Sequence, residues 1–145
     1  MQITDSLATL VSQALESAQA SGSLPAAGDV DIKIERPKLA QHGDFSTSLP
    51  LALARSMRMA PIKIAEAIAA AVPENAIVGS VNHDAPGFVN FTLSTAWMQS
   101  QVDVVRKAGE NFGSVEIGAG KSVQVEFVSV NPTGPLHVGH ARGAV

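Results

Sequence analysis

The residues of this chain best suited to chemistry are two histidines near its C-terminal end. His137 and His140 are three positions apart, so on a helix they are neighbours on one face and both could reach the same phosphate oxyanion. Gly139 between them has no side chain to hold a flat base away from the backbone. The spacing therefore predicts a nucleotide-binding site.

Two other interpretations of the pair stay open from its spacing alone. Histidines three apart also occur on ordinary surfaces and at helix ends. A zinc site needs a third or fourth ligand, and the only other histidines, His42 and His83, do not have ligand spacing to the pair. The chain contains no cysteine, which excludes disulfides, thiolate chemistry and cysteine-based zinc sites. We predict no protein-ligated metal.

The segments around the pair would place it at the end of a strand. Residues 122–128 alternate in the manner of a strand, with one apolar side formed by Val123, Val125 and Phe127. Prolines and a glycine forbid a helix before Leu136, and nothing bars one from His137 onward. Ligands of open α/β sheets bind at this position, where a helix start offers unpaired N–H groups to phosphate. Alternation alone makes Glu126 a solvent-facing strand residue, and Asn131 before proline is an ordinary turn residue.

The preceding hundred residues predict a two-layer α+β domain, because helices and a small antiparallel sheet must cover one another's apolar faces. Periodicity and proline positions predict helices over residues 3–18, 49–55, 61–72 and 95–107, and strands over residues 30–35, 76–82 and 88–94. The last helix should bury Met98, Val102 and Val105. The turn-rich run before the second helix should place Phe45 in the core, with Asp44 or Ser46 as a helix cap. Glycines then predict a linker over residues 109–120.

Composition restricts the class of protein. The chain of 145 residues has a formal net charge of −3, which does not suggest a strongly basic nucleic-acid binder. Six basic and two acidic residues nevertheless lie between Lys33 and Lys63, as expected either for a local phosphate-binding face or for an ordinary solvated surface. No stretch approaches the ~20 apolar residues that span a bilayer. We expect a protein of the cytoplasm.

A family resemblance joins these observations. The run HVGH at 137–140 resembles the HIGH signature of class I aminoacyl-tRNA synthetases, and the flanking EFVSVNPTGPL at 126–136 and ARG at 141–143 resemble the arginyl-tRNA synthetases in particular. Upstream, GDFST at 43–47 and PGFVNF at 86–91 resemble that family's N-terminal additional domain. The resemblance covers the chain from about residue 30 to its end.

The resemblance implies a reaction and a set of site residues. Arginine and ATP would form arginyl adenylate and pyrophosphate, and the arginyl group would pass to the terminal ribose of tRNA(Arg). His137 and His140 would stabilise charge on the phosphates and Gly139 would lie under the adenine. The arginine would be held by Glu126, Ser129 and Asn131. Magnesium would arrive with ATP, no cofactor would be tightly bound, and the full-length enzyme would be a monomer.

The resemblance also implies a domain organisation. Residues 1–108 would form the N-terminal additional domain, 109–120 a linker, and 121–145 the first strand and the start of the first helix of a Rossmann-like catalytic domain. We expect such a fragment to be inactive alone, since the rest of the site is absent. Residues 1–108 would be an autonomous RNA-binding module or, alternatively, a protein-interaction module. The candidates for RNA contact are Arg36, Lys38, Arg55 and Arg58.

Overall fold

The computed structural model describes residues 2–28, 30–124, 134–135 and 137–141. The chain divides into two compact units, Met1–Ala108 and Gly109–Val145. No described helix is long and apolar enough to cross a membrane.

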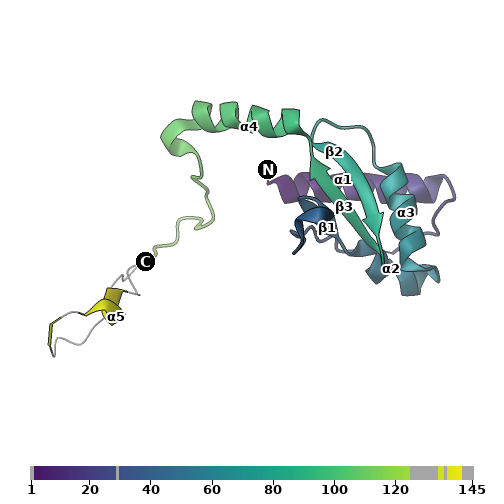
Figure 1. The fold of residues 1–145 in the computed structure, drawn as a ribbon, viewed down its shortest axis with the longest axis horizontal. Helices are drawn as coiled ribbons and strands as arrows, with labels where there is room; N and C mark the ends of the chain where they lie inside the picture. The colour runs from purple at the N-terminus through teal and green to yellow at the C-terminus, as the bar shows by residue number, and fades with distance from the viewer. Residues whose placement is uncertain (1, 29, 125–133, 136, 142–145) are drawn as a thin grey trace. The chain divides into compact units, whose positions relative to one another are not determined.

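A three-stranded antiparallel sheet forms one layer of the first unit. Its strands are β1 (Phe45–Thr47), β2 (Val78–Asp84) and β3 (Phe88–Leu93), in the order β1-β3-β2, so β3 is central (Figure 1). Val89 and Phe91 on one side of β3 are fully buried in the core. The predicted antiparallel pairing of the last two strands is confirmed, with residue 84 opposite residue 88 beside the turn.

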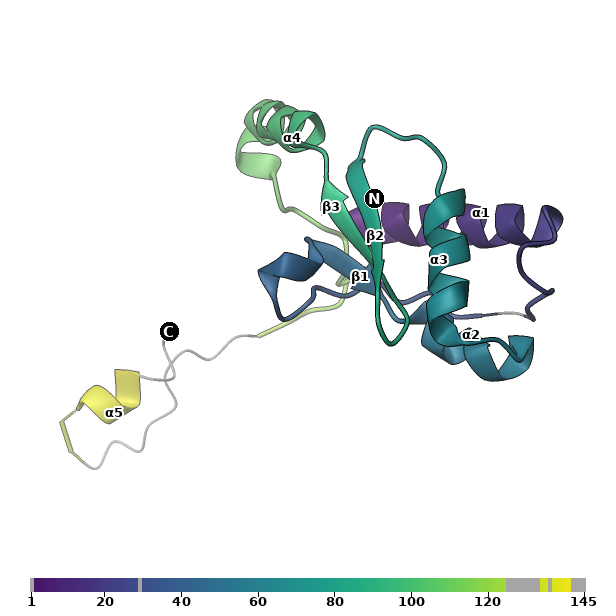
Figure 2. The same ribbon diagram turned by 45° about the vertical axis from the view of Figure 1, so that its right-hand side comes forward.

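Three helices cover the buried side of the sheet and complete the predicted two-layer α+β fold. They are α1 (Ile3–Ala20), α2 (Leu49–Met57) and α3 (Pro61–Ala71); α1 crosses behind the strands and α3 runs beside β2 (Figures 1 and 2). Each contributes an apolar stripe at helical spacing, since only such a stripe can face the core continuously. The buried residues of α1 are Leu7, Leu10, Val11, Ala14, Leu15 and Ala18.

Prolines define where α2 and α3 begin. Pro50 and Pro61 lie in the first turns of these helices, where a missing N–H costs no hydrogen bond. Helix α2 ends at Met57, and its C-cap residue Arg58 adopts the left-handed conformation with φ 51°. In α3, Ile64, Ala65 and Ile68 are fully buried, as their spacing predicts.

The predicted strand over residues 30–35 is wrong as a strand, although its pattern of burial is right. Val30, Ile32 and Ile34 pack against the core while the residues between them are exposed. Pairing is limited to one bridge, in which Glu35 and Ser46 exchange backbone hydrogen bonds of 2.9 and 2.8 Å. Alternating apolar residues predict which side chains face the core. They do not predict that another strand pairs with the segment.

The segment expected to lead directly into the second helix instead forms strand β1. Phe45 is buried, as predicted, but Ser46 pairs with neighbouring backbone and does not cap a helix. Asp44 also caps no helix: its Oδ2 accepts a hydrogen bond from the Leu93 N–H at 2.8 Å, across the sheet. The helix that follows has Ser48 as its N-cap.

Helix α4 (Thr95–Ala108) forms where predicted, but its apolar stripe is not buried. Met98, Val102 and Val105 are 43%, 59% and 40% exposed, and no residue of α4 is buried. The prediction of a buried side is therefore wrong. Helical periodicity predicts that one face of a helix is apolar. It does not predict that another part of the protein covers that face.

The described part of the second unit contains little regular structure. A short 3-10 helix spans Gly109–Asn111, and α5 (Val138–Ala141) is a single helical turn at the predicted helix position. Of the predicted strand, residues 122–124 adopt no regular structure and residues 125–128 lie outside the described residues.

Candidate nucleic-acid interface

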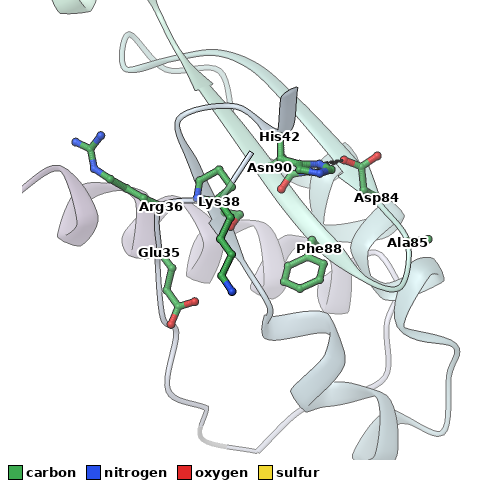
Figure 3. Close-up of a pocket in the computed structure, with 10 residues that line it drawn as sticks. Glu35, Arg36, Lys38, His42, Asp84, Ala85, Phe88 and Asn90 are labelled. Carbon is green, nitrogen blue, oxygen red and sulfur yellow. Dashed lines mark hydrogen bonds and ion pairs between the residues drawn. The ribbon is translucent and has the colours of Figure 1, made fainter. Parts of the chain in front are cut away.

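A pocket of about 360 Å³ opens beside the end of the β2–β3 hairpin, away from the core helices. Four segments form it: the stretch that bridges to β1, the short 3-10 helix η1 (Ala40–His42), strand β1 itself, and the β2–β3 hairpin around its turn (Figure 3). Its lining consists of Glu35, Arg36, Pro37, Lys38, His42, Ser46, Asp84, Ala85, Phe88 and Asn90.

Two glycines allow close approach of the segments around this pocket. Gly43 has φ 82°, and a Cβ there would lie 2.7 Å from the backbone oxygen of Phe91, so the loop carrying His42 can lie directly against β3. A Cβ on Gly87 would lie 2.5 Å from the Cβ of Pro61, so the hairpin turn can pack on the start of α3. Both contacts fix segments that are distant in sequence.

A hydrogen-bonded cluster of His42, Asp84 and Asn90 occupies one wall (Figure 3). The amide Nδ2 of Asn90 donates to the Asp84 Oδ2 at 2.7 Å, and the same oxygen is 3.0 Å from the His42 Nδ1. Asn90 is 5% exposed, whereas the side chains of His42 and Asp84 are 34% and 48% exposed. The cluster thus runs from a buried amide to groups that meet solvent.

The other wall presents cationic and aromatic groups. The side chain of Lys38 extends between Glu35 and Phe88 (Figure 3). The guanidinium of Arg36 lies 5.0 Å from the centre of the Phe45 ring, a cation–π arrangement that restrains its long side chain. The pocket thus combines the cations of Arg36 and Lys38 and the ring of Phe88 with the carboxylates of Glu35 and Asp84.

The six basic residues between Lys33 and Lys63 fall into two groups, those that form an ion pair and those that do not. Lys33 lies 3.7 Å from Asp31, and Lys63 lies 2.8 Å from Glu66. The hydrogen bond and charge of Glu66 raise the pKa of Lys63, and Lys63 in turn lowers the pKa of that carboxyl. Among the described residues the other four cations have no ion pair, and these are the predicted RNA-contact residues Arg36, Lys38, Arg55 and Arg58.

The structure brings only two of those four residues to the pocket. Arg36 and Lys38 line it, whereas Arg55 and Arg58 are exposed at the C-terminal end of α2 and are not part of its lining. The sequence interpretation missed His42, Asp84 and Phe88 as site residues. The outward position of Asn90 on β3 was the available signal, but its partners come from other segments.

The predicted nucleotide site falls mostly outside the described residues. Glu126, Ser129 and Asn131 are not among them. His137 is exposed just before α5, and its Nδ1 accepts a hydrogen bond from the Gly139 N–H at 3.1 Å. His140 lies within α5. In the described portion of the chain, no three His, Cys, Asp or Glu side chains are grouped as metal ligands would be.

Comparison with known proteins gives a consistent set of relatives. Residues 5–93 match the family described as "Arginyl tRNA synthetase N terminal domain". The arginine–tRNA ligase of Thioalkalivibrio sulfidiphilus is 45% identical over 140 residues, which are 97% of this chain and 24% of that protein. That of Nitrosomonas europaea is 47% identical over 121 residues, 83% of this chain and 21% of that protein. The chain spans about a quarter of the length of the curated relatives it matches.

Solved structures show the same likeness. The arginyl-tRNA synthetase of Thermus thermophilus aligns with 98% of this chain and 21% of its own, with a TM-score of 0.53 and 25% identity. That of Plasmodium falciparum aligns with 69% of this chain and 17% of its own, with a TM-score of 0.55; at 17% identity it supports the fold alone.

Proposed function

The chain belongs to the arginyl-tRNA synthetase family, and on that premise we propose that the complete protein is an arginine–tRNA ligase of the cytoplasm. The carboxylate of arginine attacks the α-phosphorus of ATP, which forms arginyl adenylate and releases pyrophosphate. A terminal ribose hydroxyl of tRNA(Arg) then takes the arginyl group, and AMP leaves. The observation that carries this proposal is 45% identity to an arginine–tRNA ligase across nearly the whole chain.

In this proposal the signature residues handle the nucleotide. His137 and His140 stabilise the charge that develops on the transferring phosphates, a task that rewards donors fixed before the reaction. Gly139 lies under the adenine. Magnesium arrives with ATP and neutralises part of the phosphate charge, and it needs few protein ligands.

The arginine substrate is assigned to residues upstream of the signature. Glu126 pairs with a cationic group of the substrate, since charge-assisted hydrogen bonds are roughly twice as strong as neutral ones. Asn131 and Ser129 complete the contact. These roles rest on the positions of the residues in the family motif.

The ligase proposal is tested by ATP–pyrophosphate exchange that depends on arginine. In the complete protein, we expect His140→Ala to slow exchange by about 10²–10³-fold, the usual cost of losing one fixed donor to a developing charge. His83→Ala, a substitution at an exposed histidine of β2, should leave the rate unchanged. Equal rates for wild type and His140→Ala would remove His140 from catalysis.

We further propose that the 145-residue chain does not activate arginine by itself. The supporting observation is that His137 is exposed beside a single turn of helix, whereas catalysis needs donors held rigidly. The purified chain should give no arginine-dependent exchange above background. Measurable exchange would contradict this expectation.

For the first unit, we propose that the pocket contacts tRNA. Sequence-selective binding of RNA uses unstacked bases, which lie on aromatic rings and form hydrogen bonds with polar side chains. Phe88 supplies a ring, Asn90 an amide, and Arg36 with Lys38 supply charge for phosphates. The juxtaposition of these groups in one pocket carries the proposal.

Phe88→Ala tests the contact directly. We expect it to weaken tRNA(Arg) binding by about 5–150-fold, because stacking of one base on an aromatic side chain contributes about 1–3 kcal/mol. Phe112→Ala is the matched control, since Phe112 is 56% exposed in the second unit and lines no part of this pocket. Equal affinities for the two variants would exclude stacking on Phe88.

A further inference from the structure

We propose that Asp84 is a positioning residue, which together with His42 fixes the side-chain amide of Asn90 in one orientation and so determines the hydrogen-bonding face that the pocket offers its ligand. The inference rests on the proposed tRNA contact, because it concerns how the same pocket meets RNA. The orientation of the Asn90 amide is a property of the RNA-free protein and can be tested in that state.

The geometry allows one orientation of the amide. An ionised carboxylate only accepts hydrogen bonds, so the Asn90 atom 2.7 Å from the Asp84 Oδ2 must be the NH₂ nitrogen. The reversed amide would bring two oxygens to that distance. Since Asn90 is 5% exposed, the surrounding side chains also restrict rotation of its side chain.

Asp84 is itself held in place. It is opposite Phe88 at the closed end of the hairpin, and its Oδ2 also accepts a hydrogen bond from the His42 Nδ1–H at 3.0 Å. With that proton on Nδ1, a neutral His42 ring would have Nε2 as an acceptor, and the Gln41 Nε2 lies 3.4 Å from it as a possible donor. In this arrangement the side-chain nitrogens of Asn90, His42 and Gln41 that donate a hydrogen bond each have an acceptor.

The consequence is a fixed acceptor in the pocket. No buried side-chain nitrogen or oxygen of the described residues lacks a hydrogen-bond partner, and Asn90 Oδ1 has no protein donor among them, so this oxygen is open to solvent. A ligand therefore meets a carbonyl oxygen and must bring an N–H or O–H group to it. An amide free to rotate would offer a donor as readily as an acceptor.

The orientation is tested by NMR of the ¹⁵N-labelled chain without RNA. In the wild type the shift separation of the two Asn90 side-chain protons should exceed that of a solvated amide, because one of them is hydrogen-bonded to a carboxylate. Asp84→Ala should return the separation to that of a solvated amide, and Asp84→Asn, which keeps the size but also presents an NH₂ group, should reduce it. Asp103→Ala is the control, since Asp103 pairs only with Arg106 on the exposed α4. An unchanged Asn90 signal in both position-84 variants would overturn the proposal.

The second arm measures tRNA(Arg) affinity. Removing an acidic group near a polyanion should by charge alone tighten binding, as in Asp103→Ala. If orientation matters, Asp84→Ala instead weakens binding by about 3–10-fold, the size of one lost hydrogen bond. A separation reduced to that of a solvated amide, with undiminished affinity, would overturn the role in recognition. If the wild type itself fails to bind tRNA, the proposed RNA contact fails, while the NMR arm still decides the orientation.

Discussion

Gly43 combines two conditions that no other residue type meets. Its φ of 82° with ψ of −163° is a backbone conformation restricted in practice to glycine, and a Cβ would lie 2.7 Å from the backbone oxygen of Phe91. Because the neighbouring atom belongs to the backbone, it cannot move aside as a flexible side chain would. The loop that carries His42 depends on this residue.

We therefore expect Gly43→Ala to lower the free energy of unfolding by about 2–4 kcal/mol, from backbone strain together with the contact. Gly22→Ala is the control: Gly22 also has positive φ, at 76°, but a Cβ there would have nothing within 4 Å, so a loss of about 1 kcal/mol is expected. Urea unfolding of both variants measures the difference. Equal losses would mean that the approach to β3 is not tight.

At the residue level, a site confined to one segment could be predicted from the sequence, and a site shared between segments could not. The pair His137 and His140 could be proposed because both residues lie in one short motif, and its role stays a prediction. The cluster of His42 and Asp84 could not, since its members are 42 positions apart and meet only because β1 and β2 both pair with β3. Asp44 was assigned to a local cap for the same reason, although its partner is the Leu93 N–H.

Among the elements, α3 and α4 show what helical periodicity predicts. Both have apolar residues at helical spacing, and both helices form where expected. The stripe of α3 is buried against β2, β3 and the other helices, while that of α4 is exposed. A pattern of spacing determines the face of a helix, and only the tertiary structure determines whether that face is covered.

This contrast predicts opposite results for substitutions in the two helices. Ile68→Ala in α3 should cost about 2–5 kcal/mol of unfolding free energy, because Ile68 is fully buried. Val102→Gln in α4 should change it by less than about 0.5 kcal/mol in this chain, because that side chain is 59% exposed. Thermal unfolding of the two variants checks both values. A large loss for Val102→Gln would show that its stripe is covered after all.

The strands follow the same rule. The hairpin of β2 and β3 could be predicted because its two partners are adjacent in sequence and joined by a short turn. Residues 30–35 alternate equally well, yet only Glu35 forms a bridge, with Ser46. Phe45–Thr47 has only three residues, too few for alternation to reveal the strand that pairs with β3.

At the scale of the whole molecule, charge distribution matters more than net charge. The chain has a formal net charge of −3, which would repel a polyanion at long range. The proposed binding of tRNA would then depend on a local group of cations whose charges are not already paired with acids. Arg36 and Lys38 meet both conditions at the pocket, whereas Lys33 and Lys63 are ion-paired.

The most direct test of the central claim, that the pocket of the first unit contacts tRNA, is a titration of tRNA(Arg) at several salt concentrations. For the wild type, the logarithm of the association constant should fall linearly with the logarithm of the salt concentration, since each phosphate contact releases bound counterions. The double variant Arg36→Ala/Lys38→Ala should reduce that slope by about two units, whereas Lys33→Ala/Lys63→Ala, with the same change in net charge, should alter it less. Salt-insensitive wild-type binding, or equal slopes for the two double variants, would contradict the claim.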